Sequence, residues 1–354
     1  MRDVLLDYLR CPVNRTRFNI QIINKSQKLY DGELVEIIKD GILFTDQEWF
    51  YPVINGIPRL TVEAFLDYEP FLRHHLPDFE ERKKNILSKY GSMISLTTKK
   101  NSHTKKSFGQ EWSIFNYEED KTWNADADKM VQTFLDETDE TKTSLKDKLI
   151  FDAGCGNGLL NQFIAQLGAR IIGMDLSQSV ERAFEKNSYR DAFFIQGDVQ
   201  FPPIAFAQFD IVHSSGVLIC TNNSELTFSC LEPCVKPGGK LSVWLYHPRK
   251  DFIHNLFNFI RNYTSKLPIK VQYYLYLFTL FPISYVIKRL KGNKQNKREL
   301  MIDLLDWFSP KYRWEHYHDE ATAWFLKRNF SKIKVTTDIL FGFNITGHKK
   351  SDRL

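Results

Sequence analysis

Apolar residues in the middle of the chain follow two spacings, one typical of buried strands and one typical of helices. The short apolar run 149–151 has the length of a buried strand, whereas residues 159–167 carry apolar side chains at helical spacing. A second apolar run, 169–174, ends at Asp175. The pattern therefore predicts a strand, a helix and a second strand, the unit from which doubly wound sheets are built.

Further apolar runs extend this predicted sheet towards the C-terminus. A third strand is expected just before Asp198, a fourth over residues 209–215, and a fifth within the sequence VKPGGKLSVWLYH. Residues 319–326 form an amphipathic helix that begins with two acids, and residues 330–335 lead into another strand. The predicted fold class is α/β, with a doubly wound, Rossmann-like sheet.

Three glycines occupy alternate positions, Gly154, Gly156 and Gly158, at the first strand-to-helix turn. A dinucleotide site would place its third glycine one residue later. Asp152 precedes the turn and would repel a pyrophosphate, but its carboxylate suits a ligand that carries an ammonium group. Asp175 can accept hydrogen bonds from ribose hydroxyls. Because glycines let a ligand pass close to the backbone, the residues favour S-adenosylmethionine over a dinucleotide.

The motifs FDAGCGNG, GMDLS, GDVQ, FDIVHSSGVL and VKPGGKL occur in the order found in class I S-adenosylmethionine-dependent methyltransferases. Over residues 108–246 the chain resembles the branch of this family that includes the ubiquinone and menaquinone methyltransferases. The resemblance implies that the glycine turn and Asp152 hold the amino-acid end of the cofactor, that Asp175 binds its ribose, and that its adenine lies beside Asp198. The predicted cofactor site comprises Asp152, Gly154, Cys155, Gly156, Gly158, Asp175, Leu176, Asp198, Val199 and Ser215.

The composition fits a soluble enzyme with one large domain and a small one. Of the 354 residues, 43% are hydrophobic and 26% are charged, which allows a sizeable core. The first ten residues mix charges into a helical apolar pattern, unlike a signal peptide. The five scattered cysteines are typical of a reducing compartment and not of a disulfide framework. We therefore expect a cytoplasmic protein.

Residues 1–63 form a separate predicted domain. The sequences LLDYLRCPVNRTRF and DGILFTDQEWFYPVINGIPRL resemble the small zinc-ribbon-like protein that activates several methyltransferases of tRNA and translation factors. Zinc sites of that kind use paired cysteines, but only Cys11 is present. The other three positions are occupied by Asn14, Phe44 and Gln47. The resemblance therefore implies a degenerate α+β domain in which apolar packing replaces the metal, and we predict no metal site.

A basic linker, residues 64–106, is predicted between this domain and the catalytic domain, residues 107–354. From 82 to 106 it contains eight Lys or Arg residues and no acid. We favour a solvated linker; binding to a nucleic-acid backbone or another anionic substrate is the alternative, although aromatic residues are sparse there. The resemblance places the next segment, 107–117, over the cofactor, and its Trp112 is a candidate acceptor contact.

The catalytic domain contains an insertion, residues 250–306, after its fifth strand. Its central stretch, VQYYLYLFTLFPISYVI, spans 271–287 without a charged side chain, but a proline interrupts it and its length is near the lower limit for a membrane span. We predict a helical pair that is buried or caps the active site as a lid. The following KRLKGNKQNKR carries six basic residues and no acid. A solvated loop is the favoured interpretation there, and peripheral contact with an anionic membrane is the alternative.

Methyl transfer is an in-line displacement at a sulfonium carbon, so the enzyme must hold the nucleophile close, aligned and dry. A general base is needed when the nucleophile is a hydroxyl or a protonated amine, and His247 and His316 are the candidates. Gly216 is expected to line the methyl-transfer cleft. The sequence SPKYRWEH also occurs in the resembled branch on its substrate side, which makes Tyr312 and Arg313 candidate acceptor contacts.

These patterns together predict an S-adenosylmethionine-dependent methyltransferase that acts on an oxygen, nitrogen or carbon atom of an apolar small molecule. The apolar insertion suggests the acceptor class, because a long hydrophobic surface must be shielded from water. A methyltransferase of tRNA, rRNA or a translation factor is an alternative suggested by the N-terminal domain, although HSSG stands where an amino-group motif would be. A non-catalytic cofactor-binding scaffold is a second alternative, which the intact glycine turn with both acids disfavours.

Overall fold

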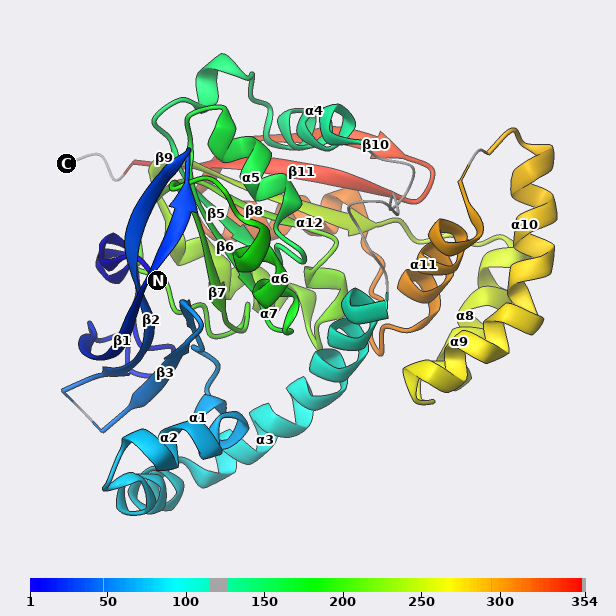
Figure 1. Cartoon of the computed structure of the whole chain (residues 1–354). Helices are drawn as coiled ribbons and strands as arrows, with labels where there is room; N and C mark the ends of the chain where they lie inside the picture. The colour runs from blue at the N-terminus through cyan, green and yellow to red at the C-terminus, as the bar shows by residue number, and fades with distance from the viewer. Residues whose placement is uncertain (47, 115–125, 294, 352–354) are drawn as a thin grey trace.

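The chain folds around two sheets, a four-stranded antiparallel sheet near the N-terminus and a larger mixed sheet that follows it (Figure 1). The computed structural model describes residues 1–46, 48–114, 126–293 and 295–351. Within these ranges, the side chains of residues 103, 106–114 and 253 are outside the description.

Within the described residues, seven strands form the larger sheet. Their bounds are β5 Leu149–Ala153, β6 Arg170–Asp175, β7 Ala192–Gln196, β8 Phe209–Ser215, β9 Val235–Tyr246, β10 Phe330–Ile339 and β11 Gly342–Lys349. The order across the sheet is β10-β11-β9-β8-β5-β6-β7, with β5 to β9 parallel and β11 antiparallel to both of its neighbours. The chain changes direction along the sheet at β5, and such switch points are where doubly wound sheets bind ligands. The predicted α/β fold class is confirmed.

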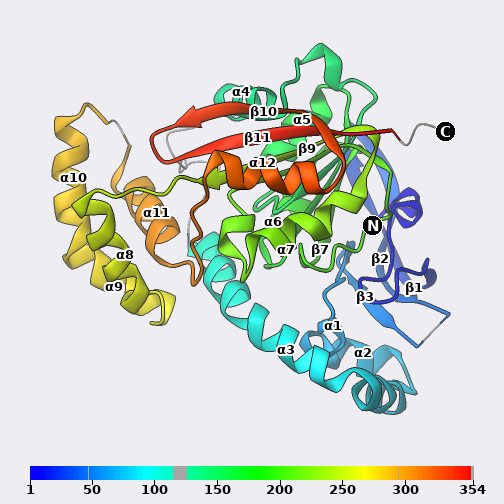
Figure 2. The ribbon, with the colours of Figure 1, turned by 180° about the vertical axis from the view of Figure 1, so that it is seen from behind.

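Helices cover both faces of this sheet (Figures 1 and 2). One face packs against α4 Ala127–Thr138, α5 Leu159–Gln166 and α6 Ser179–Lys186, and the other against α7 Ser224–Leu231 and α12 His318–Lys327. Successive side chains of a strand point to opposite faces, so Ile150 joins the core under α4 to α6 and Phe151 joins the core under α7 and α12. Burial on both faces explains why these strands are continuous apolar runs in the sequence.

The N-terminal domain pairs its strands in chain order and covers one edge of the larger sheet. Its strands are β1 Asn19–Tyr30, β2 Glu33–Phe44, β3 Phe50–Ile54 and β4 Ile57–Pro58. Directly after β4, Arg59 forms a parallel bridge with Gln196 of β7, and the amide of Leu60 donates to the Gln196 carbonyl at 2.8 Å. The buried guanidinium of Arg59 lies 2.9 Å from Glu181 of α6. These contacts satisfy the backbone at the β7 edge, which would otherwise be open to pairing with another chain.

The segment between the two sheets is helical and packed. It forms α1 Ala64–Asp67, α2 Glu69–His75 and α3 Phe79–Ile114. Ile86 and Ile94 of α3 are buried in the main core, and Lys105 lies 2.6 Å from the buried Glu63. The segment is therefore not the solvated linker that its charge pattern predicts, because its basic residues meet acids that lie elsewhere in the sequence.

The insertion forms a group of four helices at one side of the molecule, away from the N-terminal sheet in both views (Figures 1 and 2). The helices are α8 Phe252–Thr264, α9 Ile269–Phe278, α10 Leu280–Leu290 and α11 Lys297–Phe308. The charge-free stretch 271–287 is thus a helical pair, as predicted, but α10 buries none of its residues. In the described parts of the chain, no helix has the length and apolar character needed to cross a membrane.

Candidate functional site

A cavity of about 520 Å³ opens at the carboxyl ends of the parallel strands. This volume lies within the usual range for small-molecule sites. The predicted site residues that line it are Gly154, Gly156, Asp175, Leu176, Asp198, Val199, Ser215, Gly216 and Tyr312. The structure therefore brings together most of the cofactor residues expected from the sequence and two of the expected acceptor contacts.

The glycine turn after β5 is specified by both backbone conformation and packing. Gly154, Gly156 and Gly158 have φ angles of 103°, 55° and 69°, in the region that favours glycine. A Cβ at Gly154 would lie 2.1 Å from Cγ2 of Val217, and one at Gly158 would lie 2.4 Å from the ring of Phe194. No larger residue fits at these two positions without movement of the neighbours. The turn thus presents bare backbone to the cavity.

Asp175 ends β6 and directs its carboxylate towards the glycine turn. Its Oδ2 accepts a hydrogen bond from the amide of Gly156 at 3.1 Å. Its Oδ1 accepts hydrogen bonds from the amide and hydroxyl of Ser177, at 2.8 and 2.7 Å. A carboxylate has about four acceptor positions, so Asp175 can accept a further hydrogen bond from a ligand hydroxyl in the cavity. A ribose offers such hydroxyls, and ribose binding by Asp175 stays a prediction.

Asp198, after β7, is buried and is held by the long helix α3. Its Oδ2 accepts hydrogen bonds from Nζ of Lys100 at 2.7 Å and from Nδ2 of Asn101 at 3.0 Å. Both of these α3 residues, with Thr104, also line the cavity. The helix is therefore a wall of the ligand site, which the sequence did not reveal because the segment was expected to be a linker.

A buried histidine connects two acids beside the glycine turn. Nδ1 of His213 in β8 lies 3.0 Å from Oδ1 of Asp152, and its Nε2 lies 2.7 Å from Oε2 of Glu137 in α4. Burial alone lowers the pKa of His213, but the hydrogen bonds with Asp152 and Glu137 outweigh it and raise the pKa to about 10. The imidazolium is thus a cation between two carboxylates. Glu137 also accepts a hydrogen bond from Ser215 and lines the cavity.

Several predicted site residues do not line the cavity, namely Asp152, Cys155, Gly158, Arg313, His247 and His316. The carboxylate of Asp152 is engaged by His213. Burial, followed by the charges of Asp175 and Asp152, raises the pKa of the Cys155 thiol, so this cysteine stays protonated and is not a nucleophile. The side chain of Trp112 lies outside the described residues.

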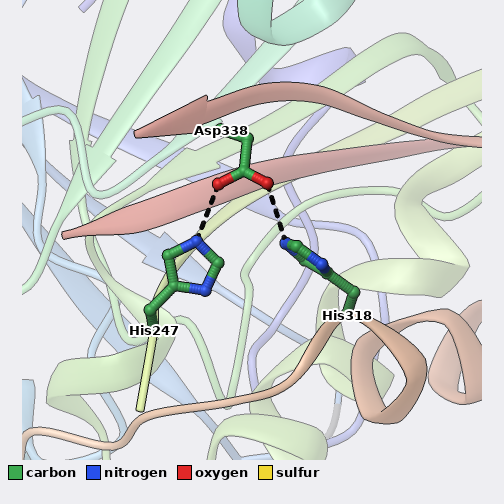
Figure 3. Close-up of side chains that lie close together, drawn as sticks. All are labelled: His247, His318 and Asp338. Atoms are coloured by element: carbon green, nitrogen blue, oxygen red, sulfur yellow. Dashed lines mark hydrogen bonds and ion pairs between the residues drawn. The ribbon is translucent and has the colours of Figure 1, made fainter. Parts of the chain in front are cut away.

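The two candidate general bases are engaged by carboxylates outside the cavity. Nε2 of His247 lies 2.8 Å from Oδ1 of Asp338, whose other oxygen lies 3.4 Å from Nε2 of His318 (Figure 3). Nδ1 of His316 lies 2.9 Å from Oε1 of Glu320. The nitrogen and oxygen atoms of His247, His318 and Asp338 that could bind a metal lie within 4.8 Å of one another. Among the described residues this is the one group of three or more such side chains. Their mutual contacts account for this arrangement without an ion.

Aromatic side chains dominate another part of the cavity wall. This part is formed by Trp244, Tyr246, Trp307, Tyr312, Ile339 and Phe341. Trp307 and its neighbour Asp306 belong to α11, so the insertion contributes directly to the cavity. The guanidinium of Arg313 lies behind this wall, 3.8 Å from the ring centroid of Tyr246 and 4.7 Å from that of Trp307. Arg313 therefore supports the wall and does not line the cavity.

The fold is a Rossmann-like domain whose cavity is lined by a glycine turn and by the carboxylate of Asp175, which can accept hydrogen bonds from hydroxyl groups. Residues 151–243 match the family described as methyltransferase domain. The matched range contains the glycine turn, Asp175 and Asp198, which are the groups that shape the cofactor part of the cavity.

Two curated proteins are similar to part of this chain. Protein arginine N-methyltransferase 1 of Saccharomyces cerevisiae is 35% identical over 80 residues, which cover 21% of this chain and 23% of that protein. A ubiquinone biosynthesis O-methyltransferase of Azoarcus sp. (strain BH72) is 34% identical over 101 residues, which cover 27% and 42%. The chain thus spans less than half the length of these relatives.

Two solved structures are similar at a lower level. Magnesium protoporphyrin IX methyltransferase from Synechocystis PCC 6803 has a TM-score of 0.38 and 16% identity, covering 63% of this chain and 82% of that one. A complex of a methyltransferase activator with a methyltransferase from Haloferax volcanii has a TM-score of 0.43 and 12% identity, covering 72% and 99%. Similarity at this level does not extend the assignment beyond the matched domain.

The chain therefore carries a class I S-adenosylmethionine-dependent methyltransferase domain, and S-adenosylmethionine is the cofactor of that domain. The residues fit this cofactor. Asp175 has acceptor capacity left for ribose hydroxyls, and the glycine turn exposes backbone without a side chain. Leu176 and Val199 add apolar surface of the kind that an adenine ring packs against.

Proposed function

We propose that the protein is a methyltransferase that transfers a methyl group from S-adenosylmethionine to an oxygen, nitrogen or carbon atom of an apolar small molecule. The observation that carries this proposal is that one cavity joins the cofactor residues to an aromatic wall. Asp175 and Asp198 line the cofactor part, and Tyr246 and Trp307 belong to the aromatic part. An acceptor with a flat or extended apolar body suits such a wall.

The charges of the cavity support a small-molecule acceptor over a nucleic acid. Among the described residues, the charged side chains that line the cavity are Lys100, Glu137, Asp175, Asp198 and Asp306. Four of these five are carboxylates, and the one lysine is paired with Asp198. A negative cavity attracts the positively charged cofactor and repels the phosphates on which nucleic-acid binding depends.

The residues of the chain would act mainly by positioning. When bound, the cofactor supplies a methyl group on a positively charged sulfur. Asp175 would hold the ribose, and the bare backbone at Gly154 and Gly156 would let the cofactor lie close to the sheet. The aromatic wall would exclude water and hold the acceptor in line with the methyl group. Ring faces near the sulfur would also favour its positive charge.

We propose Asp306 as the group that receives a proton where the acceptor has one to lose. It lines the cavity beside Trp307, whereas His247 and His316 do not line it. Burial, followed by the negative charge of Asp306, raises the pKa of Tyr246. Tyr246 therefore stays protonated and does not act as the base, so we assign that role to the carboxylate of Asp306.

For residues 1–63 we propose a degenerate activator domain that stabilises the methyltransferase domain within one chain. The contacts of Arg59 and Leu60 with Gln196 support this, because they join the small domain to β7. Burial is the main influence on the Cys11 thiol and raises its pKa, which disfavours the thiolate that zinc requires. A cytoplasmic protein fits the buried free thiols of Cys11 and Cys234.

Two other functions compete with this proposal. The activator-like domain favours a methyltransferase of RNA or of a translation factor, and a scaffold without turnover would use the same cofactor site. The test is transfer of a labelled methyl group from S-adenosylmethionine into separated metabolite, lipid, RNA and protein fractions of a cell extract. We expect the label in an organic-soluble small molecule. Label in RNA or protein would favour the first alternative, and cofactor binding without any transfer would favour the second.

A further inference from the structure

The outermost helix of the insertion exposes a continuous apolar stripe. In α10 the exposed apolar residues are Ile283, Val286, Ile287 and Leu290. Their spacing of three, four and seven positions places them on one helix face. Leu290 is 84% exposed, and α10 has no buried residue at all. An apolar face of this kind on a folded protein indicates a surface that contacts a partner.

The two preceding helices repeat this feature. In α9 the exposed apolar residues are Val271, Tyr274, Leu275 and Phe278. In α8 they are Phe252, Leu256, Phe259 and Tyr263. Each set again follows helical spacing, so each helix has one exposed apolar face. We call the stripes of α8, α9 and α10 together the apolar platform.

The platform is not needed for the core of the insertion itself. The buried part of that core consists of Ile269 and Tyr276 of α9, which pack with Met301, Ile302 and Leu305 of α11. The insertion stands out from the rest of the molecule in both views (Figures 1 and 2). The outer stripes are therefore additional apolar surface with a different role from core formation.

The charge of the insertion indicates what covers this surface. The four acids of the insertion lie at its ends, and between Asp251 and Glu299 the sequence has nine Lys or Arg residues and no Asp or Glu. Of these nine, Arg261 is buried and Lys288 pairs with Asp303. Lys270 in α9 and Lys291 after α10 are exposed. Two copies of the chain would bring these like charges together, so the pattern disfavours a homodimer through this face. An apolar layer under negative headgroups satisfies both the apolar and the basic residues.

We propose that the apolar platform docks the protein on a membrane surface that contains anionic lipid. Helices with this pattern lie in the plane of the membrane interface, with their apolar faces among the acyl chains and their basic residues near the headgroups.

Docking there would place the membrane next to the acceptor part of the cavity. The platform helix α9 packs against α11, and α11 provides Asp306 and Trp307 to the cavity. An acceptor dissolved in the bilayer would then have a short path to the aromatic wall. This last step rests on the proposed apolar acceptor, whereas docking itself does not.

The test is co-sedimentation of the full chain with vesicles. We expect binding to vesicles of phosphatidylcholine mixed with phosphatidylglycerol, weak binding to phosphatidylcholine alone, and loss of binding at high salt. Combined Ile283→Ser, Val286→Ser and Leu290→Ser substitutions should weaken binding about tenfold or more, because each removes apolar surface from the membrane contact. Cofactor affinity should not change, since none of these residues lines the cavity.

A matched control uses exposed leucines elsewhere. Leu29 and Leu34, at the end of the β1–β2 hairpin, are 57% and 70% exposed, and their change to serine should leave vesicle binding unaltered. Equal binding of the α10 variant and the parent would overturn the proposal. So would a dimer in sedimentation velocity that the α10 substitutions convert to a monomer, without vesicle binding. Vesicle binding by a chain that transfers no methyl group would retain docking and reject the proposed function.

Discussion

Replacement of Asp175 by alanine should weaken cofactor binding more than it weakens the fold. The carboxylate accepts three hydrogen bonds within the protein, from the amide of Gly156 and from the amide and hydroxyl of Ser177. It would also accept the ribose hydroxyls. Loss of the ligand's partner in a partly buried site costs about 1–3 kcal/mol. At about 1.4 kcal/mol per tenfold change, Asp175→Ala should raise the dissociation constant roughly five- to 150-fold.

Isothermal titration with S-adenosylmethionine and with its demethylated product measures this directly. Asp210→Ala is the matched control, because Asp210 also accepts a backbone amide hydrogen bond, from Leu149 at 3.0 Å, but does not line the cavity. The control should keep the parent affinity. A dissociation constant for Asp175→Ala within about twofold of the parent would refute the ribose assignment. A stronger affinity for a nicotinamide dinucleotide would refute the ligand class.

Four further outcomes are expected. The purified protein should contain no stoichiometric zinc and should not unfold with a chelator, because Cys11 lacks its three partner ligands; elemental analysis near one zinc per chain would contradict this. Deletion of residues 250–306 removes Asp306 from the cavity and should abolish turnover, while cofactor binding should still be detectable by calorimetry. The single substitution Asp306→Asn should lower kcat with little change in cofactor affinity. The pKa of His213 is raised from 6.5 to about 10, so its contribution to stability is complete below pH 6.5 and is lost as the pH rises towards 10; thermal unfolding should show this decline in the parent and not in His213→Gln.

The central sheet and its glycine turn could be predicted because their causes are local. Strands buried on both faces appear as short apolar runs, and the helix α5 appears as a change of spacing directly after the turn. Gly154 and Gly158 were recognisable because positive φ angles and close neighbours leave little choice of residue. For the same reason Asp175, at the end of a predicted strand, was placed correctly at the cavity.

The residues that were missed depend on contacts between distant segments. Glu137 meets His213 across 76 positions, and Lys100 meets Asp198 across 98 positions. No sequence motif in α4 or α3 predicts such a contact, and the basic residues of α3 are typical of a solvated linker. His247, predicted as a base, does not line the cavity for another reason. Its position at the end of β9 was predictable, but the direction of its side chain towards Asp338 was not.

The most direct test of the account is the dependence of turnover on the apolar length of the acceptor. Acceptors that share one methylated head group and differ only in the length of an aliphatic tail should be compared by kcat/KM. Each methylene buried at the aromatic wall is worth about 0.8 kcal/mol, so kcat/KM should rise by about fourfold per methylene until the wall is covered. A value that does not change with tail length, or methylation of RNA in place of these acceptors, would contradict the proposal of an apolar small-molecule acceptor.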